Sequence, residues 1–325
     1  MKRLFGYLAL FALLAAAPLL LNRFCADSRY WVDVLNSVGL YLVLALSLNI
    51  ILGYAGMFNM GHAVFYAIGA YTTAILNTRF GMPVLATLPL AGCTAAVFAL
   101  MTARPIIHLR GDYLLIVTIG MVEIVRIALM NDVFGLTGGA NGIFGIERIR
   151  FFGFRLTKPV HYFYLIWAFA GLTVLLFSLL ENSRFGRALR YLNADEVAAA
   201  GSGIDVAHYR LAAFVLGAGW AGMCGTLFAA KMTIISPQSF NYWESVLLFM
   251  IVILGGSGSI PGVILGAFLV AGLPELFRSF DNARQLVFGL ALMIMMIVRP
   301  QGLLPPKTRR YQAAAPLTAL AEKTP

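Results

Sequence analysis

The sequence is poor in charged residues. Only 12% of its 325 residues are charged, whereas 60% are hydrophobic. Soluble domains carry roughly 25% charged residues, so this chain has too few polar side chains to cover a water-facing surface. Its outer surface must therefore face lipid. The formal net charge of +10 fits cytoplasmic loops beside anionic lipid better than a nucleic-acid interface.

Cysteines and the signatures of enzymes are also scarce. The three cysteines, Cys25, Cys93 and Cys224, lack the spacing of a metal or redox pair. No lysine follows a glycine, so the chain has no phosphate-binding loop of the Walker A type. It also lacks a His-Glu-x-x-His zinc motif and a Gly-x-Ser-x-Gly nucleophile elbow. We expect a non-enzyme without a metal or cofactor. If ATP drives it, a separate subunit must bind the nucleotide.

Long apolar segments fill most of the chain. Runs such as 246–254 and 286–298 are continuous and do not alternate as the strands of a membrane barrel do. Since a lipid-exposed backbone must satisfy its own hydrogen bonds, we predict an all-α bundle of membrane-spanning helices over residues 1–304. A tail over 305–325, rich in Pro, Ala, Lys and Arg, is expected to be cytoplasmic and disordered. The ten expected segments are 4–21, 31–52, 57–77, 84–103, 113–130, 161–180, 211–230, 243–256, 261–277 and 284–298.

The distribution of Lys and Arg between the loops predicts the topology. Ten crossings that start in the cytoplasm place most of these residues on the cytoplasmic side, together with both termini. Ten segments divide into two inverted halves of five. Glycine-rich stretches at 53–61 and 255–262 interrupt segments at matching places, which suggests an inverted 5+5 repeat. If those stretches are re-entrant, the number of crossings falls to eight.

Small and polar residues within these interruptions are the candidates for a transport path. They are Gly53, Gly56, Asn59, Gly61, His62, Gly255, Gly256 and Gly258. Broken helices free backbone groups to meet a polar solute, and glycines let backbones approach closely. Tight packing, with Asn59 and His62 bonded across helices, explains the same residues equally well.

Two charged residues, Glu123 and Arg126, lie within the fifth segment. Their spacing of three places them on one helix face. Charges in the hydrocarbon region face a partner or a watery cavity. A structural ion pair is the favoured interpretation, and a contact with the solute is the alternative.

Two loops are candidates for docking. The loop 181–210 contains a short helical stretch near 193–200, with Asn193 as the expected N-cap, Glu196 at the third helical position and Gly201 and Gly203 after it. Such a helix can dock into a groove of a cytoplasmic partner or lie on the membrane surface. The glycine-rich stretch 136–146 is expected outside the membrane, as a docking surface for an extracytoplasmic partner or as a packed cap.

Taken in order, several motifs resemble the permease subunit of branched-chain amino acid ABC transporters, specifically the larger of the two paired permeases. The resemblance covers roughly residues 31–305. Its motifs are 48–50 with 53–56, 61–62 and 69–71; 110–113 with Thr118 and 123–126; 137–139 with 141–142; 187–190 with 195–196, 198–199 and 203–204; 254–258 with Gly262 and 266–267; and 300–303.

The resemblance implies a function and a set of partners. It implies ATP-driven import of branched-chain or related small neutral amino acids across a bacterial inner membrane. The implied partners are a second permease, two ATPase subunits that bind the ATP, and an extracytoplasmic substrate-binding protein. The implied ATPase-coupling residues are Arg187, Arg190, Asp195, Glu196, Ala198, Ala199, Gly203 and Ile204. Relatives that carry urea or short amides share these motifs. An ATP-independent channel or secondary transporter is the alternative from another class.

The sequence departs from the family pattern at two positions. Asn193 stands where an arginine is common, which puts one ionic contact to the ATPase in doubt. His62 stands where a small or polar residue is usual.

Overall fold

The computed structural model describes residues 17–18, 27–109, 111–132, 135–151, 154–276, 289–290, 293, 297–299 and 301–306. The predicted segments 4–21 and 284–298 fall almost wholly outside these residues, as do Cys25, Arg110 and nearly all of the predicted tail. Within the described residues, the predicted helical bundle is confirmed.

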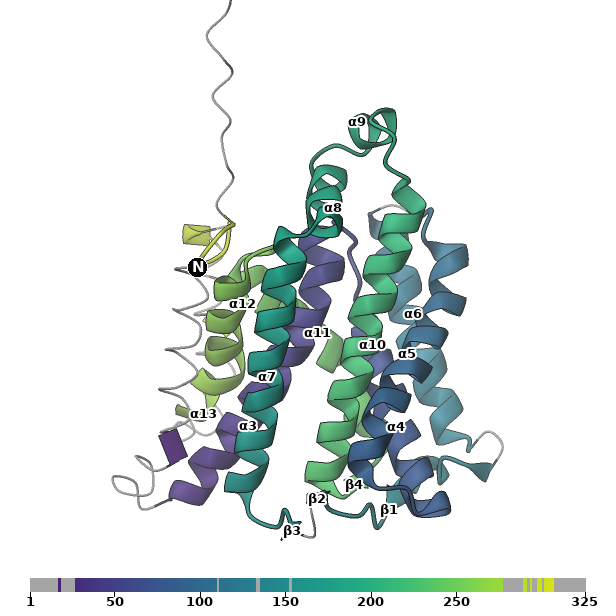
Figure 1. The fold of residues 1–325 in the computed structure, drawn as a ribbon, viewed down its shortest axis with the longest axis vertical. Helices are drawn as coiled ribbons and strands as arrows, with labels where there is room; N and C mark the ends of the chain where they lie inside the picture. Colours follow the sequence, from purple (N-terminus) through teal and green to yellow (C-terminus); the bar gives the residue numbers. More distant parts are fainter. Residues whose placement is uncertain are drawn as a thin grey trace, which may run out of the picture.

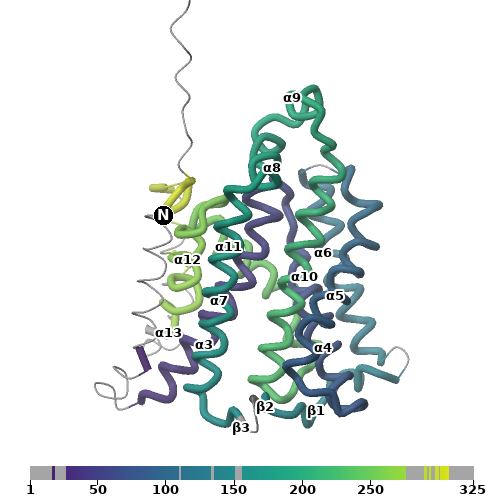
Figure 2. Tube along the Cα trace, in the orientation of Figure 1, coloured from purple at the N-terminus to yellow at the C-terminus, as the bar shows by residue number. Residues whose placement is uncertain are grey.

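Helices make up nearly all of the described chain (Figures 1 and 2). They are α3 (Ser28–Asn49) with its π-helical continuation η1 (Ile50–Tyr54), α4 (His62–Phe80), α5 (Val84–Ile106), α6 (Asp112–Met130), α7 (Pro159–Asn182), α8 (Arg184–Ala194), α9 (Glu196–Gly201), α10 (Val206–Met232), α11 (Tyr242–Gly255), α12 (Ile260–Ala267), η5 (Phe268–Gly272) and α13 (Leu273–Leu276).

The short elements lie together at the end of the bundle opposite α9 (Figure 1). Two helical turns, η3 (Gly139–Asn141) and η4 (Pro237–Phe240), flank the strands. Strand β1 (Ile143–Phe144) pairs antiparallel with β4 (Ile234–Ile235), and β2 (Arg150–Phe151) pairs antiparallel with β3 (Phe154–Arg155).

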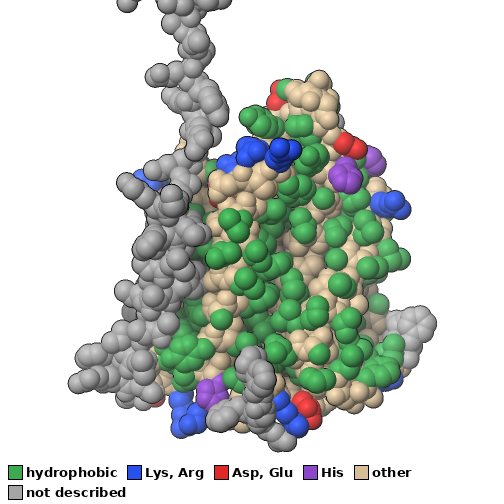
Figure 3. Space-filling model, viewed as in Figure 1, with side chains coloured by type: hydrophobic (Ala, Val, Ile, Leu, Met, Phe, Trp, Pro, Cys, Tyr) green, Lys and Arg blue, Asp and Glu red, His purple; other side chains and the backbone are tan. Residues whose placement is uncertain are grey.

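Within the part of the chain that the structure describes, six helical stretches are long and apolar enough to cross a membrane. They are Ser28–Tyr54, Val84–Ile106, Asp112–Met130, Pro159–Asn182, Val206–Met232 and Pro237–Gly255. The chain is therefore a multi-pass membrane protein. Figure 3 shows the matching surface, which is hydrophobic over the middle of the bundle and carries charged side chains towards the two ends. Ten crossings and an inverted repeat remain predictions.

One predicted segment differs from the helix observed. The segment expected at 57–77 becomes helical only at His62, because residues 55–61 form a turn and an irregular stretch. The segment expected at 243–256 matches α11 to within one residue at each end. The candidate functional site lies at the starts of α4 and α11.

Small residues build the contact between α10, α4 and α5. A methyl group at Gly222 of α10 would lie 2.5 Å from the Cβ of Ala95 in α5. A methyl group at Gly225 would lie 2.5 Å from the carbonyl oxygen of Tyr66 in α4. Thr73 and Thr226 join α4 to α10 by a 2.8 Å hydrogen bond. Because lipid offers no hydrophobic drive between helices, such close packing is what holds the three helices together.

Candidate functional site

The chain between η1 and α4 turns back into the bundle. Gly56 has a φ of 68°, a conformation that favours glycine. The irregular stretch that follows has its own polar contacts: the amide of Gly61 donates to Asn59 Oδ1 at 2.7 Å, and the amide of Met60 donates to Thr118 Oγ1 of α6 at 3.1 Å. These bonds hold the non-helical backbone within the apolar bundle, where water is absent.

Helix α4 is capped by a side chain from α11. The amide of Ala63, in the first turn of α4, donates to Ser245 Oγ at 3.0 Å. The neighbouring His62 lies 2.7 Å from Ser47 Oγ of α3 through its Nε2 atom. We define the polar crossing point as Ser47, Asn59, His62, Thr118 and Ser245, all of which are buried.

Two polar atoms at the polar crossing point have no hydrogen-bond partner, Nδ2 of Asn59 and Nδ1 of His62. Ser47 donates its hydroxyl proton to the carbonyl of Leu44 at 2.7 Å. It must therefore accept from Nε2–H of His62, which leaves Nδ1 as an acceptor. Asn59 thus offers a donor and His62 offers an acceptor. Unsatisfied buried polar atoms are costly, so these two atoms make the polar crossing point a candidate site.

A carboxylate and a phenol lie next to the polar crossing point. Glu244 precedes Ser245 in the first turn of α11, where Asn241 caps the helix by accepting from the Glu244 amide at 3.1 Å. Tyr41 of α3 donates to Glu244 Oε2 at 3.1 Å. Sequence reasoning missed Tyr41, Ser47 and the pair Glu244–Ser245 as site residues. The signal in the sequence that could have indicated this site is Glu244, an acidic residue at the start of the apolar segment 243–256.

The predicted path glycines divide between two places. Gly61 lies at the polar crossing point, whereas Gly53, Gly56, Gly255, Gly256 and Gly258 gather at the end of the bundle nearest α8. There the amide of Gly258 donates to Asn49 Oδ1 at 2.8 Å. A methyl group at Gly53 would lie 2.8 Å from the Cα of Gly258. The glycines at the end of the bundle nearest α8 therefore allow close packing of the backbone.

The loop 181–210 forms two helices, α8 and α9, which project from one end of the bundle (Figure 1). The predicted N-cap, Asn193, was wrong: α8 continues through Ala194, and Asp195 caps α9 instead, accepting from the amides of Val197 and Ala198 at 2.9 and 3.0 Å. Gly203 follows α9 with a φ of 83°, and the amide of Ile204 donates to the carbonyl of Ala199. Val197 is 79% exposed at the tip.

Two ion pairs and a hydrogen bond from an arginine to a backbone carbonyl lie within the loop. Both oxygens of Glu196 accept from Arg210 of α10, at 3.2 and 3.1 Å. Arg190 lies 3.6 Å from Glu181, and Arg187 donates to the carbonyl of Asn182 at 2.6 Å. These bonds fix α8 and α9 to the ends of α7 and α10.

Asn193 links the loop to the bundle. Its Nδ2 donates to the carbonyl oxygen of Gly53 at 3.1 Å, and a methyl group at Gly56 would collide with the same side chain. A movement of α8 would therefore act on the chain that leads from Gly53 to the polar crossing point. The sequence pointed to Asn193 as a helix cap and as a departure from the family pattern, and gave no sign of the contact with Gly53.

Glu123 and Arg126 of α6 form the predicted ion pair. Arg126 donates through Nε and Nη2 to Glu123 Oε2 at 2.9 and 2.6 Å. The side chains of Arg126 and Glu123 remain 28% and 39% exposed. The pair therefore faces outward, away from the polar crossing point.

The stretch 136–146 forms a packed cap at the end opposite α9. Asp132 Oδ1 accepts from the amide and the hydroxyl of Thr137 and from the amide of Gly138, at 2.7, 2.9 and 3.0 Å. These bonds, that of the Thr137 amide first, lower the pKa of the Asp132 carboxyl. The pairing of β1 with β4 ties the cap to the end of α10.

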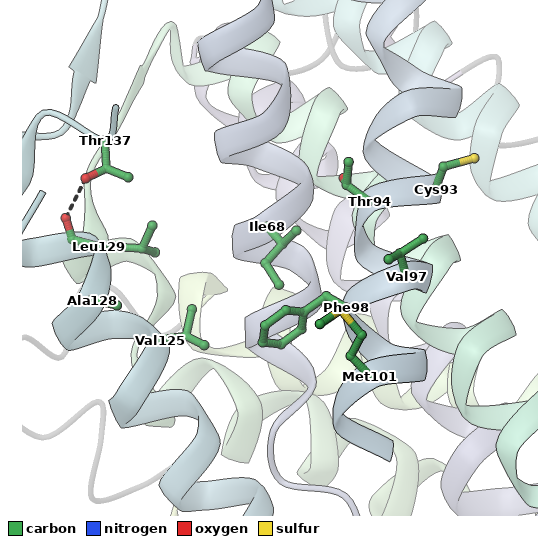
Figure 4. Close-up of a pocket in the computed structure, with 10 residues that line it drawn as sticks. All are labelled: Ile68, Cys93, Thr94, Val97, Phe98, Met101, Val125, Ala128, Leu129 and Thr137. Carbon is green, nitrogen blue, oxygen red and sulfur yellow. Dashed lines mark hydrogen bonds between the residues drawn. The ribbon is translucent and has the colours of Figure 1, made fainter. Parts of the chain in front are cut away.

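An apolar cavity of about 590 Å³ lies between α4, α5 and α6 and reaches the cap at Thr137 (Figure 4). Its lining residues are Ile68, Cys93, Thr94, Val97, Phe98, Met101, Val125, Ala128, Leu129 and Thr137. No charged residue is among these lining residues. Among the described residues, no group of His, Cys, Asp or Glu could hold a metal ion.

Comparison with known proteins gives consistent matches. The family model described as branched-chain amino acid transport system / permease component matches residues 30–298. The permease protein LivM of Escherichia coli K12 is 40% identical over 301 residues, covering 86% of this chain and 71% of the relative. LivH of the same organism is 27% identical over 81% of this chain and 91% of its own length. LivM of Methanocaldococcus jannaschii is 25% identical over 83% of this chain and 91% of its own length. No solved structure matches the chain.

Proposed function

The chain belongs to the family of permease components of branched-chain amino acid transport systems, and we propose that it forms one membrane-spanning half of an ATP-driven importer. The single observation that carries this proposal is the geometry of α8 and α9. They project from one end of an apolar bundle and connect through Asn193 to the broken region between α3 and α4. The chain has no Walker A loop, so the energy must come from ATPase subunits.

The proposed assembly contains a second permease, two ATPases and an extracytoplasmic substrate-binding protein. Relatives of this chain include both LivM and LivH, which are named as permease proteins of a branched-chain amino acid system, and this supports a second permease. In the bacterial inner membrane, α9 would lie in the cytoplasm with both termini, and the cap at 136–146 would lie outside.

Helix α9 is the proposed docking element for an ATPase. Asp195 caps it, the Glu196–Arg210 pair fixes it to α10, and Val197 is exposed at its tip. The closing of the ATPases on ATP would move α9 and α8. Asn193 would then pass that movement to Gly53 and on to the start of α4.

The polar crossing point is the proposed place where the solute passes. An amino acid carries a carboxylate that accepts hydrogen bonds and an ammonium that donates them, and Asn59 and His62 offer the complementary atoms. Both side chains are buried, and we therefore propose that the path is closed in this conformation. A path that opens only on ATPase movement would prevent leakage.

The decisive experiment is reconstitution of the complete complex in vesicles, with labelled leucine and with or without ATP. ATP-dependent accumulation of leucine would support the importer. Uptake that ignores ATP would identify a channel or secondary transporter. If urea or a short amide stimulates ATP hydrolysis and leucine does not, the cargo is different although the machine is the same.

A separate variant tests the transmission step. Asn193→Ala removes the bond to Gly53 and leaves α9 unchanged. We expect ATPase association to stay normal while leucine transported per ATP hydrolysed falls about fivefold, as expected for the loss of about 1 kcal/mol. Ser202→Ala, which removes a bond within the same loop, is the matched control. Unchanged transport by Asn193→Ala would remove Asn193 from the mechanism.

A further inference from the structure

We propose that the outward face of α6 is the surface on which the second permease packs. The surface is a stripe made of Ile116, Gly120, Glu123 and Ile127, which we call the α6 stripe. Their spacing of four, three and four residues places them on one helix face. The proposal rests on the pairing of permeases given under the proposed function and adds the location of the contact.

The α6 stripe is open in the isolated chain. Ile116 is 65% exposed and Ile127 is 50% exposed. In the most apolar stretch of α6 only 22% of the residues are buried, against 33% to 78% in the other five candidate spans. Contact with lipid alone would explain an exposed apolar face, so the case depends on the two residues in its middle.

Glu123 makes lipid an unsuitable neighbour. Its ion pair with Arg126 lies in the middle of a candidate span and is partly exposed. Charged groups in the hydrocarbon region are costly even when paired, and in membrane proteins they face other protein or water. A second protein chain would cover this face and could satisfy the remaining hydrogen bonds of the two side chains.

Gly120 provides the second and independent observation. A glycine inside a helix costs up to about 1 kcal/mol relative to alanine, so it needs a packing reason. Gly39, Gly92 and Gly217 have one, because a methyl group there would lie 2.7 to 2.8 Å from an atom of a neighbouring helix. A methyl group at Gly120 would meet nothing within 4 Å. Gly120 is therefore suited to the close approach of a helix that the described part of this chain does not supply.

The missing helix is assigned to the second permease. Glycine in a membrane helix lets another helix approach closely, and a chain of the same family offers spans of suitable length. The opposite flank of α6 is different in chemistry, because its residues Val125, Ala128 and Leu129 are all apolar and line the cavity of Figure 4. That flank suits lipid, whereas the α6 stripe suits protein.

Photo-crosslinking within the complete complex tests the proposal. A benzophenone-bearing phenylalanine analogue is placed at Ile116 or Ile127, and in matched chains at Leu172 or Leu179 of α7, which are 48% and 58% exposed. Irradiation should join this chain to the second permease from the α6 positions, at least about fivefold more than from α7. The affinity-tagged second permease identifies the product.

A substitution gives a readout that needs no probe. Gly120→Leu should reduce co-purification of the second permease about tenfold while the chain itself remains folded. Ala168→Leu, which enlarges an exposed small residue of α7, should leave co-purification unchanged.

The outcomes separate the surface from the pairing. Normal co-purification with adducts only from α7 would overturn the surface and leave the pairing intact. Adducts that join two copies of this chain through α6 would overturn the assignment to the second permease. If the wild-type chain never co-purifies with the second permease, both the proposed pairing and the proposed contact surface are wrong.

Discussion

Helices α10 and α6 are both membrane spans, yet they occupy opposite situations. The mean hydropathy of α6 is 2.1 and that of α10 is 1.6, but 61% of the most apolar stretch of α10 is buried and only 22% of that of α6. The more apolar helix is therefore the more exposed. In a membrane, apolarity fits a helix for lipid, and small residues decide which helices pack inside.

The surroundings of the glycines show the same difference in burial between α10 and α6. Gly217, Gly222 and Gly225 of α10 each lie against the neighbouring helices, on α3, α5 and α4 respectively. Gly120 of α6 faces open space. The same residue type thus builds the interior of this chain in α10 and, in our proposal, an interface with another chain in α6.

The largest effect is expected when the glycines themselves are enlarged. Gly222→Leu places a side chain against Ala95 and the backbone of Ala91, and should destabilise the chain by about 3 kcal/mol, at the upper end of overpacking penalties. Gly120→Leu should stabilise the isolated chain by up to about 1 kcal/mol, because leucine is a better helix former than glycine. Denaturant unfolding of the purified chain in detergent measures both. Equal destabilisation by the two variants would contradict the proposed difference between the packed glycine of α10 and the open glycine of α6.

The next largest effect concerns two Glu–Arg ion pairs, one between α9 and α10 and one within α6. Glu196→Gln weakens the pair that joins α9 to α10, and we expect about a fivefold loss of ATPase association, equivalent to about 1 kcal/mol. Glu123→Gln weakens the pair on α6 and should reduce association of the second permease instead. Quantitative pull-down of both partners from each variant separates the two effects. If each variant lost both partners, the pairs would have no separate roles.

The sequence predicts the features of the fold that depend on neighbouring residues, such as helices and their breaks. Helix formation follows from runs of apolar residues, and the predicted spans at 84–103, 113–130 and 161–180 each lie within an observed helix. The break near Gly53 was also predicted, because glycine and polar residues interrupt the apolar run there.

Contacts between distant residues could not be predicted in the same way. Ser245 caps α4 although 182 residues separate it from Ala63. Asn193 was expected to begin a helix, but it lies within α8 and bonds to Gly53, 140 residues away. Nothing in the neighbouring sequence of Ser245 or Asn193 encodes these partners. They follow from how the helices pack.

A smaller effect compares two buried threonines. Thr226→Val removes the bond between α10 and Thr73, and should cost about 0.6 kcal/mol of stability without changing transport. Thr118→Val leaves the Met60 amide unpaired beside the polar crossing point, so it should cost about 1 kcal/mol of stability and also lower the rate of leucine uptake. Unfolding and uptake are measured on both variants. A transport defect in Thr226→Val alone would place the path along α10 rather than beside the inner edge of α6.

The smallest effect is expected just beyond the last turn of α6, where Asp132 ties the cap to the bundle. Its hydrogen bonds from Thr137 and Gly138 lower the pKa of the carboxyl below its ordinary value of 3.8. A carboxyl whose pKa is lowered in the folded protein contributes stability above its unfolded pKa, and loses it as the pH falls through the folded pKa. Amide hydrogen exchange at Thr137 and Gly138, corrected for intrinsic rates, should therefore accelerate only below about pH 3.8. Asp132→Asn tolerates the φ of 50° at this position and cannot titrate, so its exchange should show no such step. The amide of Thr226 in α10, far from any titrating group of the cap, is the internal control. A step of equal size there would mean that the whole bundle loosens with acid, and that the cap of α6 is no less stable than the interior of α10.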